Sequence, residues 1–230
     1  NALSLLRDAA LGVARLHARG IAHADLRAAN VLVLRGERQA RNLVFETVES
    51  FDRLDVLVNN ASRFYPTPVG EATESQWDDI VGTNLKAPYF LAQAAVPHLR
   101  KTGGSIVNIA DIYGDRPLIG YLIYSVAKAG VIMLSRQLAN EWGPHGIRSN
   151  VVSPGMVITP MSQSFYDTPG VTERRAAVVP MRRVGMPQDM ADAILFLASD
   201  RASYVNGDEI MVDCGYANML MNLVPRPGFE

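Results

Sequence analysis

Apolar residues along the chain alternate between short runs and longer periodic stretches from about residue 40 onward. Short apolar or β-branched runs, which are typical of buried strands, occupy residues 54–58, 105–110, 148–153 and 209–213. Stretches with the periodicity of amphipathic helices occupy residues 74–99, 122–142 and 188–198. Thr73 stands where an N-cap is expected for the first of these helices, and Gly143-Pro144 ends the second.

The order of these elements predicts the fold class. Strand–helix units of this length imply parallel strands joined by helical crossovers, and apolar strand cores imply a sheet that is covered on both faces. We therefore expect residues 1–230 to form a single α/β domain with a doubly wound, Rossmann-like parallel sheet. Residues 156–187 contain several Pro and Gly residues with weak periodicity, so we expect a substrate loop or mobile helical lid there.

The composition of the 230 residues fits one domain with a sizeable core, since 48% are apolar and 20% are charged. The net charge of −1 gives no basic footprint for nucleic acid or an anionic membrane. Cys214 is the one cysteine, which excludes an internal disulfide, and we expect it to be a small core residue. The sequence shows no long uncharged apolar stretch and no basic segment followed by an apolar run at its start, so we expect a cytoplasmic protein.

Tyr124 and Lys128 are the first candidates for chemistry. They are four residues apart within a predicted helix, which places them on one face, and Asp111 precedes the tyrosine by thirteen residues. A neighbouring ammonium lowers the pKa of a phenol, so that the phenol exchanges a proton with a carbonyl or alcohol oxygen near neutral pH. This chemistry fits the reduction of C=O or C=N bonds. The alternative is a half-buried tyrosine beside a solvated lysine on an ordinary amphipathic helix.

Polar and turn residues follow each predicted strand, and ligands of open parallel sheets bind outside the carboxyl ends of the strands. These residues are Asn60, Ala61 and Ser62 after the first strand, Asp111 after the second, and Pro154, Gly155 and Thr159 after the third. We expect the three loops to converge on one crevice beside the helix that carries Tyr124 and Lys128.

Six segments between residues 40 and 216 resemble the short-chain dehydrogenase/reductase family. They are LDVLVNNAS (54–62), Asn84 in GTNLKAPYF, GGSIVNIAD (103–111), YSVAK (124–128), IRSNVVSPG (147–155) with Thr159, and NGDEIMVDCGY (206–216). Their order and spacing agree with the family. The resemblance implies a nicotinamide cofactor, hydride transfer to a small-molecule substrate, no bound metal, and a homotetramer or dimer.

The resemblance also implies roles for individual residues. Tyr124 would be the general acid, and Lys128 would lower its pKa and hydrogen-bond the nicotinamide ribose. Asn84 would hold a water in a proton relay to Lys128. The remaining matches would line the cofactor site: Asn60 and Ala61 at the adenosine, Ser62 at the nicotinamide, and Pro154, Gly155 and Thr159 at the carboxamide.

Asp111 occupies the place where most of the family has serine, and pteridine reductases share this aspartate. The segment NNASRFYPTP (59–68) is also similar to that subgroup, in which the residue matching Phe64 stacks on the pterin. By resemblance, Asp111 would orient Tyr124 or relay a proton to it, the substrate would be a pterin or dihydropterin, and NADPH would be preferred with NADH possible. After residue 145 the chain resembles members that act on sugars, alcohols or ketoacyl groups, so a generic alcohol or ketone oxidoreductase is the alternative.

Four of these residues have a purely structural alternative. Asp111 could be a surface turn residue, Phe64 could be loop packing, Asn84 could be a helix-packing amide, and Thr159 could be only an N-cap.

The beginning of the chain departs from the family pattern, because it lacks the TGxxxGxG motif that approaches the cofactor pyrophosphate. Residues 1–40 therefore form an atypical or incomplete first half of the cofactor-binding unit. Residues 1–36 locally resemble a protein kinase catalytic loop, with His23, Asp25 and Asn30 at the HxDLxxxxN spacing, but no other kinase motif accompanies them. A non-catalytic structural or interaction protein with the family fold is the third alternative.

Overall fold

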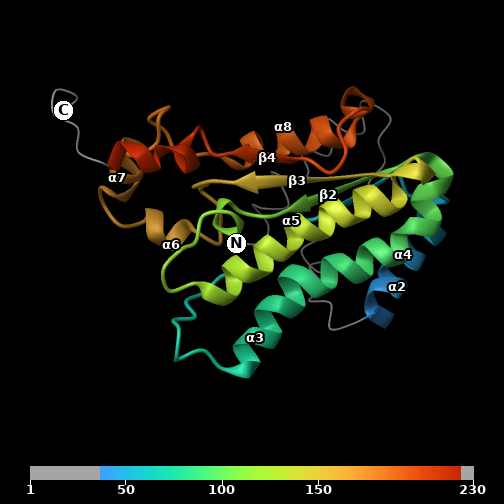
Figure 1. Ribbon diagram of the computed structural model, residues 1–230, viewed down its shortest axis with the longest axis horizontal. Helices are drawn as coiled ribbons and strands as arrows, with labels where there is room; N and C mark the ends of the chain where they lie inside the picture. The colour runs from blue at the N-terminus through green and yellow to red at the C-terminus, as the bar shows by residue number, and fades with distance from the viewer. Residues whose placement is uncertain (1–36, 224–230) are drawn as a thin grey trace.

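The computed structural model describes residues 37–223 and contains one sheet of four parallel strands among them (Figure 1). The strands are β1 (Val56–Asn59), β2 (Ser105–Ile109), β3 (Arg148–Pro154) and β4 (Glu209–Val212), and they lie side by side in chain order. All three strand pairs are parallel, with Asn59 opposite Asn108 and Val152 opposite Ile210. Each observed strand overlaps a predicted one, so the predicted α/β class with a parallel sheet is confirmed.

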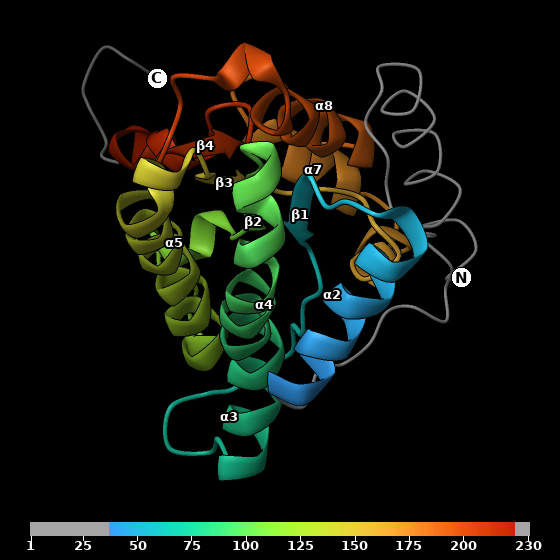
Figure 2. The ribbon, with the colours of Figure 1, turned by 90° about the vertical axis from the view of Figure 1, so that its right-hand side faces the viewer.

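Helices cover both faces of the sheet (Figures 1 and 2). On one face lie α4 (Ala87–Thr102) and α5 (Leu122–Trp142), with α2 (Glu37–Phe51) packed against α4. The other face is covered by α8 (Pro187–Ala198). The neighbouring β2 residues Ile106 and Val107 point to opposite faces and are both fully buried, which two-sided coverage requires.

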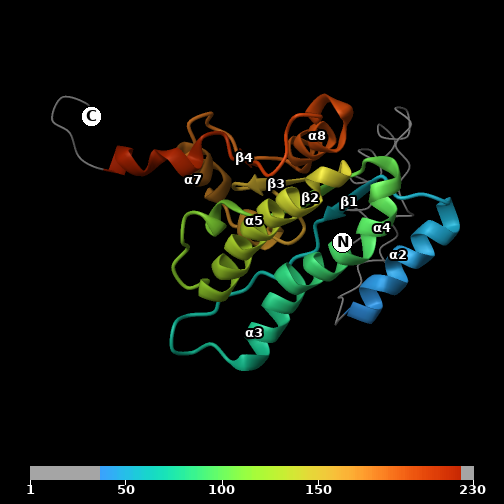
Figure 3. The same cartoon turned by 45° about the vertical axis from the view of Figure 1, so that its right-hand side comes forward.

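The predicted helix over residues 74–99 is continuous but contains a wide turn (Figure 3). It consists of α3 (Glu74–Val81), a π-helical segment η2 (Gly82–Lys86) and α4. Thr73 is the N-cap as predicted, and it forms a capping box with Gln76. The helix ends at Thr102, where Gly103 takes a left-handed φ of 63°. Because π turns are rare and cluster at functional sites, the position of Asn84 within η2 is notable.

Residues 156–187 form a segment with its own short helices, α6 (Gln163–Tyr166) and α7 (Val171–Ala177). Its two ends are joined by a parallel bridge between Val157 and Gly185. The Gly185 N–H donates a hydrogen bond to the Met156 carbonyl, and the Gly185 carbonyl accepts one from the Ile158 N–H. Both helices lie near the end of the sheet toward which the strand arrows point (Figure 1). The lid function of this segment stays a prediction.

Short 3-10 turns complete the connections: η3 (Ile112–Gly114), η4 (Gly143–His145), η5 (Asp200–Ala202) and η6 (Tyr216–Leu223).

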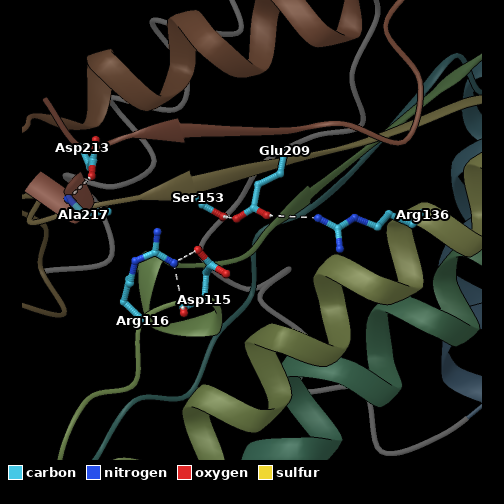
Figure 4. Close-up of polar contacts among 7 residues, drawn as sticks. All are labelled: Asp115, Arg116, Arg136, Ser153, Glu209, Asp213 and Ala217. Carbon is cyan, nitrogen blue, oxygen red and sulfur yellow. Dashed lines mark hydrogen bonds and ion pairs between the residues drawn. The ribbon is translucent and has the colours of Figure 1, made fainter. Parts of the chain in front are cut away.

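Polar contacts fix β4 to its neighbours (Figure 4). Ser153 on β3 donates a hydrogen bond of 2.6 Å to Glu209 on β4, and the second carboxylate oxygen of Glu209 lies 3.8 Å from Arg136 on α5. After β4, Asp213 accepts hydrogen bonds from the backbone N–H groups of Gly215 and Ala217, which starts η6. The loop after β3 passes close to this turn, so β3 and β4 end at the same place.

The predictions for residues 1–36, including the kinase-like residues His23, Asp25 and Asn30, lie outside the described part of the chain. Within residues 37–223 no helix is long and apolar enough to span a bilayer.

The close approach of the loops after β3 and β4 depends on Gly155. A Cβ atom at this position would lie 2.6 Å from Asp213 Cβ and 2.9 Å from Asp213 Cα. We expect Gly155→Ala to lower the free energy of unfolding by about 1–3 kcal/mol, because the obstruction includes backbone that cannot rotate away. Urea denaturation measures the change. Gly82→Ala is the matched control, since a Cβ there meets no atom within 4 Å and should not destabilise; equal losses in both variants would contradict this account.

Candidate active site

The carboxyl ends of β1, β2 and β3 lie together because the strands are parallel and adjacent. Asn60 follows β1, Asp111 follows β2 after Ala110, and Pro154 ends β3. The N-terminal turns of α5 reach the same edge of the sheet (Figure 1), and α5 packs against the η3 turn that follows Asp111. The predicted convergence of strand-end loops beside this helix is therefore present.

Asp111 and Tyr124 form the central contact of the site. The Tyr124 hydroxyl donates a hydrogen bond of 2.8 Å to Asp111 Oδ2, while Asp111 Oδ1 accepts one of 3.0 Å from the Tyr113 backbone N–H. Asp111 is thus the N-cap of η3 as well as the partner of Tyr124. Burial raises the pKa of Asp111, and the bonds from Tyr113 and Tyr124 oppose that rise only in part. Asp111 does occupy a turn, but its carboxylate faces the phenol rather than solvent.

The pKa of Tyr124 is raised well above 10 rather than lowered. Burial is the largest cause, followed by the negative charge of Asp111, and Tyr124 is only 5% exposed. Lys128 does not reach the phenol oxygen: its Nζ lies 5.6 Å from the centroid of the ring and donates to the Ile109 carbonyl at 2.8 Å. The expectation that Lys128 lowers this pKa is therefore wrong for the structure as it stands, and Tyr124 is a neutral phenol that can donate a proton.

Lys128 is buried, with 2% of its surface exposed, so the alternative of a solvated lysine is also wrong. Burial lowers its pKa from 10.5 to about 8, although the charge of Asp111 acts in the opposite direction. An ammonium has three N–H donors, and the Ile109 carbonyl accepts one of them. Because no other acceptor bonds to it within residues 37–223, two donors of this buried cation remain for a ligand at the carboxyl end of β2.

Ser62 and Phe64, in the loop after β1, lie beside Tyr124. The Phe64 ring meets the edge of Tyr124 at a centroid distance of 4.8 Å and stacks on Tyr121 at 4.5 Å. The stacking on Tyr121 shows that Phe64 does serve loop packing. Ser62 lowers the pKa of Tyr124 slightly, yet its buried hydroxyl has no partner at hydrogen-bond length within residues 37–223.

Asn84 is fully buried in η2, which packs against α5. Its amide exchanges two hydrogen bonds with the Arg63 backbone, accepting from the N–H at 2.7 Å and donating to the carbonyl at 2.9 Å. The Asn84 side chain therefore holds the loop that carries Ser62 and Phe64 in place, which agrees with the alternative that Asn84 is a packing amide. A role for Asn84 in a water relay stays a prediction.

The other predicted residues lie along the same edge or next to it. Asn60 and Ala61 are exposed after β1, and Pro154 pairs with Val212 before Gly155. Thr159 exchanges hydrogen bonds with Ser162, its N–H donating to Ser162 Oγ at 3.0 Å, but Ser162 and not Thr159 is the N-cap of α6. Their contacts with a cofactor stay predictions.

Four residues that the sequence did not indicate also approach the site: Tyr113, Tyr166, Arg175 and Tyr216. Tyr113 packs against the buried cluster that contains Tyr124, and burial together with the charge of Asp111 raises its pKa to about 12. Its position two residues after Asp111 was a usable signal. Tyr166 and Arg175 come from α6 and α7, where no periodicity or motif marks them.

The part of the chain from residue 37 to 223 contains no set of side chains suited to binding a metal ion. No group of three or more His, Cys, Asp or Glu side chains is close enough there to hold an ion.

Comparisons with known proteins identify the family of the chain. A family model described as "Enoyl-(Acyl carrier protein) reductase" matches residues 9–217. The chain is 36% identical over 186 residues to the 3-oxoacyl-(acyl-carrier-protein) reductase FabG of Thermotoga maritima, covering 80% of this chain and 75% of that protein. It is also 36% identical over 180 residues to 2-dehydro-3-deoxy-D-gluconate 5-dehydrogenase of Escherichia coli, with 76% and 70% covered.

A solved structure shares the fold. The crystal structure of a protein from Sinorhizobium meliloti that is designated a short-chain alcohol dehydrogenase superposes with a TM-score of 0.76. It is 33% identical and covers 86% of this chain and 76% of its own length. With the parallel sheet and the Asp111–Tyr124–Lys128 arrangement, these matches show that the chain belongs to the short-chain dehydrogenase/reductase family of oxidoreductases.

Proposed function

We propose that the protein reduces a carbonyl group with NAD(P)H as hydride source and Tyr124 as proton donor. The observation that carries the proposal is the 2.8 Å hydrogen bond between Tyr124 and Asp111 beside the buried Lys128. The relatives named above act on an oxoacyl group and a sugar acid, and their names support a C=O substrate.

The described residues fit the nicotinamide half of such a cofactor. Two N–H donors of Lys128 remain after its bond to Ile109, and the Ser62 hydroxyl and Asn59 Oδ1 are buried without partners within residues 37–223. These polar atoms lie at the ends of β1 and β2 or on the adjoining turn of α5, where a polar ligand would satisfy them. When bound, the cofactor supplies the hydride. Residues 37–223 contain no glycine-rich loop for its pyrophosphate, so our assignment is limited to the nicotinamide side, with NADPH as the preferred form.

The proton chemistry follows from the order of the groups. Tyr124 remains protonated near neutral pH and can pass its proton to a carbonyl oxygen as that oxygen becomes an alkoxide. The resulting phenolate lies near Lys128, whose ammonium is still largely charged below its pKa of about 8. Asp111 accepts the hydrogen bond of the Tyr124 hydroxyl and so orients the phenol for this transfer.

A pterin or dihydropterin substrate is the second candidate. Asp111 bonded to Tyr124 and an aromatic ring at Phe64 favour it, although Phe64 already stacks on Tyr121. The relatives described above bear names that refer to other substrates, so the generic carbonyl reductase comes first.

We expect NADPH to bind in a fluorescence titration and the protein then to oxidise it with ketones. Dihydrobiopterin, assayed beside a panel of ketones and oxoacyl thioesters, decides between the two candidates. Failure to bind either NADPH or NADH would remove the enzyme assignment and leave the non-catalytic alternative.

Tyr124→Phe should lower kcat/KM by about 10²–10⁴-fold, the range for loss of a general acid. The substitution keeps the ring contact with Phe64 and removes only the hydroxyl. Tyr204→Phe is the matched control, because Tyr204 is fully exposed in the turn that precedes β4, at the opposite end of this strand from the site, and should retain wild-type rates. Full activity in Tyr124→Phe would exclude the proposed acid.

The buried ammonium of Lys128 should be visible in the pH dependence of stability. Below pH 8 the folded and unfolded states both carry the charge, so the folded state bears the whole cost of burying it. Between pH 8 and 10.5 the folded state releases the proton first, so the free energy of unfolding should rise with pH. Urea denaturation of the wild type and Lys128→Met across this window should show their difference changing by on the order of a few kcal/mol. A difference that stays constant with pH would mean that the ammonium is not desolvated.

A further inference from the structure

Arg175 on α7 lies over two aromatic rings of α6. Its guanidinium carbon is 4.8 Å from the centroid of the Tyr166 ring and 5.4 Å from that of Phe165. These contacts join the two short helices of the 156–187 segment, which lie near the carboxyl end of the sheet (Figure 1). Aromatic faces stabilise the charge of a cation, but they do not accept regular hydrogen bonds from its N–H groups.

The side-chain polar groups of Arg175 and Tyr166 make no hydrogen bonds within residues 37–223. The Arg175 guanidinium makes no hydrogen bond or ion pair there, whereas that of Arg183 forms a two-pronged contact with Asp189 at 2.8 Å. The Tyr166 hydroxyl is buried and has no hydrogen-bond partner in the same range. Buried polar groups are normally paired, so the Tyr166 hydroxyl indicates a missing acceptor, which the N–H groups of the partly buried Arg175 could share.

The two donors are linked to the proton donor through Tyr113. Tyr113 packs against the buried cluster that contains Tyr124, and its backbone N–H donates a hydrogen bond to Asp111. Arg175 is close enough to Tyr113 to lower its pKa against the effect of burial, and Tyr166 also acts on it electrostatically. Arg175 and Tyr166 therefore lie within electrostatic range of Tyr113, which follows Asp111 by two residues.

The charge of the segment agrees with an anionic ligand. Residues 156–187 contain four arginines against two acidic residues, whereas the whole chain has a net charge of −1. Arg183 is paired with Asp189, whereas Arg175 forms no ion pair within residues 37–223 and acts electrostatically on Tyr113.

We propose that Arg175 and the Tyr166 hydroxyl bind an anionic oxygen group of the substrate, so that the site selects carbonyl compounds that bear a carboxylate or a phosphate. A planar guanidinium matches either group with two parallel N–H donors. The inference rests on the proposed function, because it names the substrate class of the same site.

Calorimetric titration tests the anion site without turnover. Acetoacetate and its methyl ester form one pair, and hydroxyacetone phosphate with hydroxyacetone forms the other, which separates carboxylate from phosphate recognition. Wild type should bind the anionic member of at least one pair more tightly by roughly 10- to 100-fold, and Arg175→Gln should abolish that preference. Arg175→Lys should recover only part of it, since lysine keeps the charge but not the fork.

Arg174→Gln is the matched control, because it removes the same charge from an exposed neighbouring position of α7 and should leave the preference intact. In NADPH oxidation assays, Arg175→Gln should raise KM for the anionic ketone and leave kcat/KM for its neutral partner within about threefold.

Equal binding of both members of each pair by the wild type would overturn the proposal. So would an equal loss for anionic and neutral ketones in Arg175→Gln, because that result means that Arg175 only holds α6 and α7 together. Arg175-dependent anion binding without reduction of any ketone would support the anion site and refute the proposed reductase function.

Discussion

The docking of α5 across the end of β2 is the constraint on which the site depends. Three contacts define it: the Tyr124–Asp111 hydrogen bond, the Lys128–Ile109 hydrogen bond, and the close approach of Gly114 to the backbone at Lys128. A Cβ at Gly114 would lie 2.9 Å from the carbonyl carbon of Lys128, so a larger residue would push η3 away from the helix. The docking of α5 thus brings Asp111, Tyr124 and Lys128 together at the carboxyl end of β2.

This arrangement costs free energy, because it removes ionisable groups from water. Burial raises the pKa of Asp111 and lowers that of Lys128, so each charged form is less stable here than in solvent. Their opposite charges compensate one another only in part. A site that exists for stability would replace such groups with apolar ones, whereas a site that moves protons needs groups whose two protonation states are close in energy.

The fold could be predicted from the sequence because its signals are local. The apolar period of residues 122–142 and the following Gly143-Pro144 predicted the extent of α5, and Thr73 predicted the start of α3. The juxtaposition of Asp111 with Tyr124 followed from the family spacing. The direction of the Tyr124 pKa could not be predicted from the i,i+4 spacing, because it depends on burial and on where the lysine Nζ finds its acceptor. The hydrogen bonds between Asn84 and Arg63 join residues 21 positions apart, so no local sequence pattern indicates them.

Tyr166 on α6 and Arg175 on α7 could not be predicted from the sequence because no periodicity or motif marks them, and they also bear on substrate specificity. The proton-transfer groups occupy strand ends and one helix face, where the parallel sheet leaves little freedom to vary. The 156–187 segment is joined at its base by the Val157–Gly185 bridge, so the helices between can change without disturbing the sheet. In the proposed reductase, selection among carbonyl substrates is therefore most readily altered there. A cation stacked on aromatic rings is suited to such selection because its orientation is set before a ligand arrives.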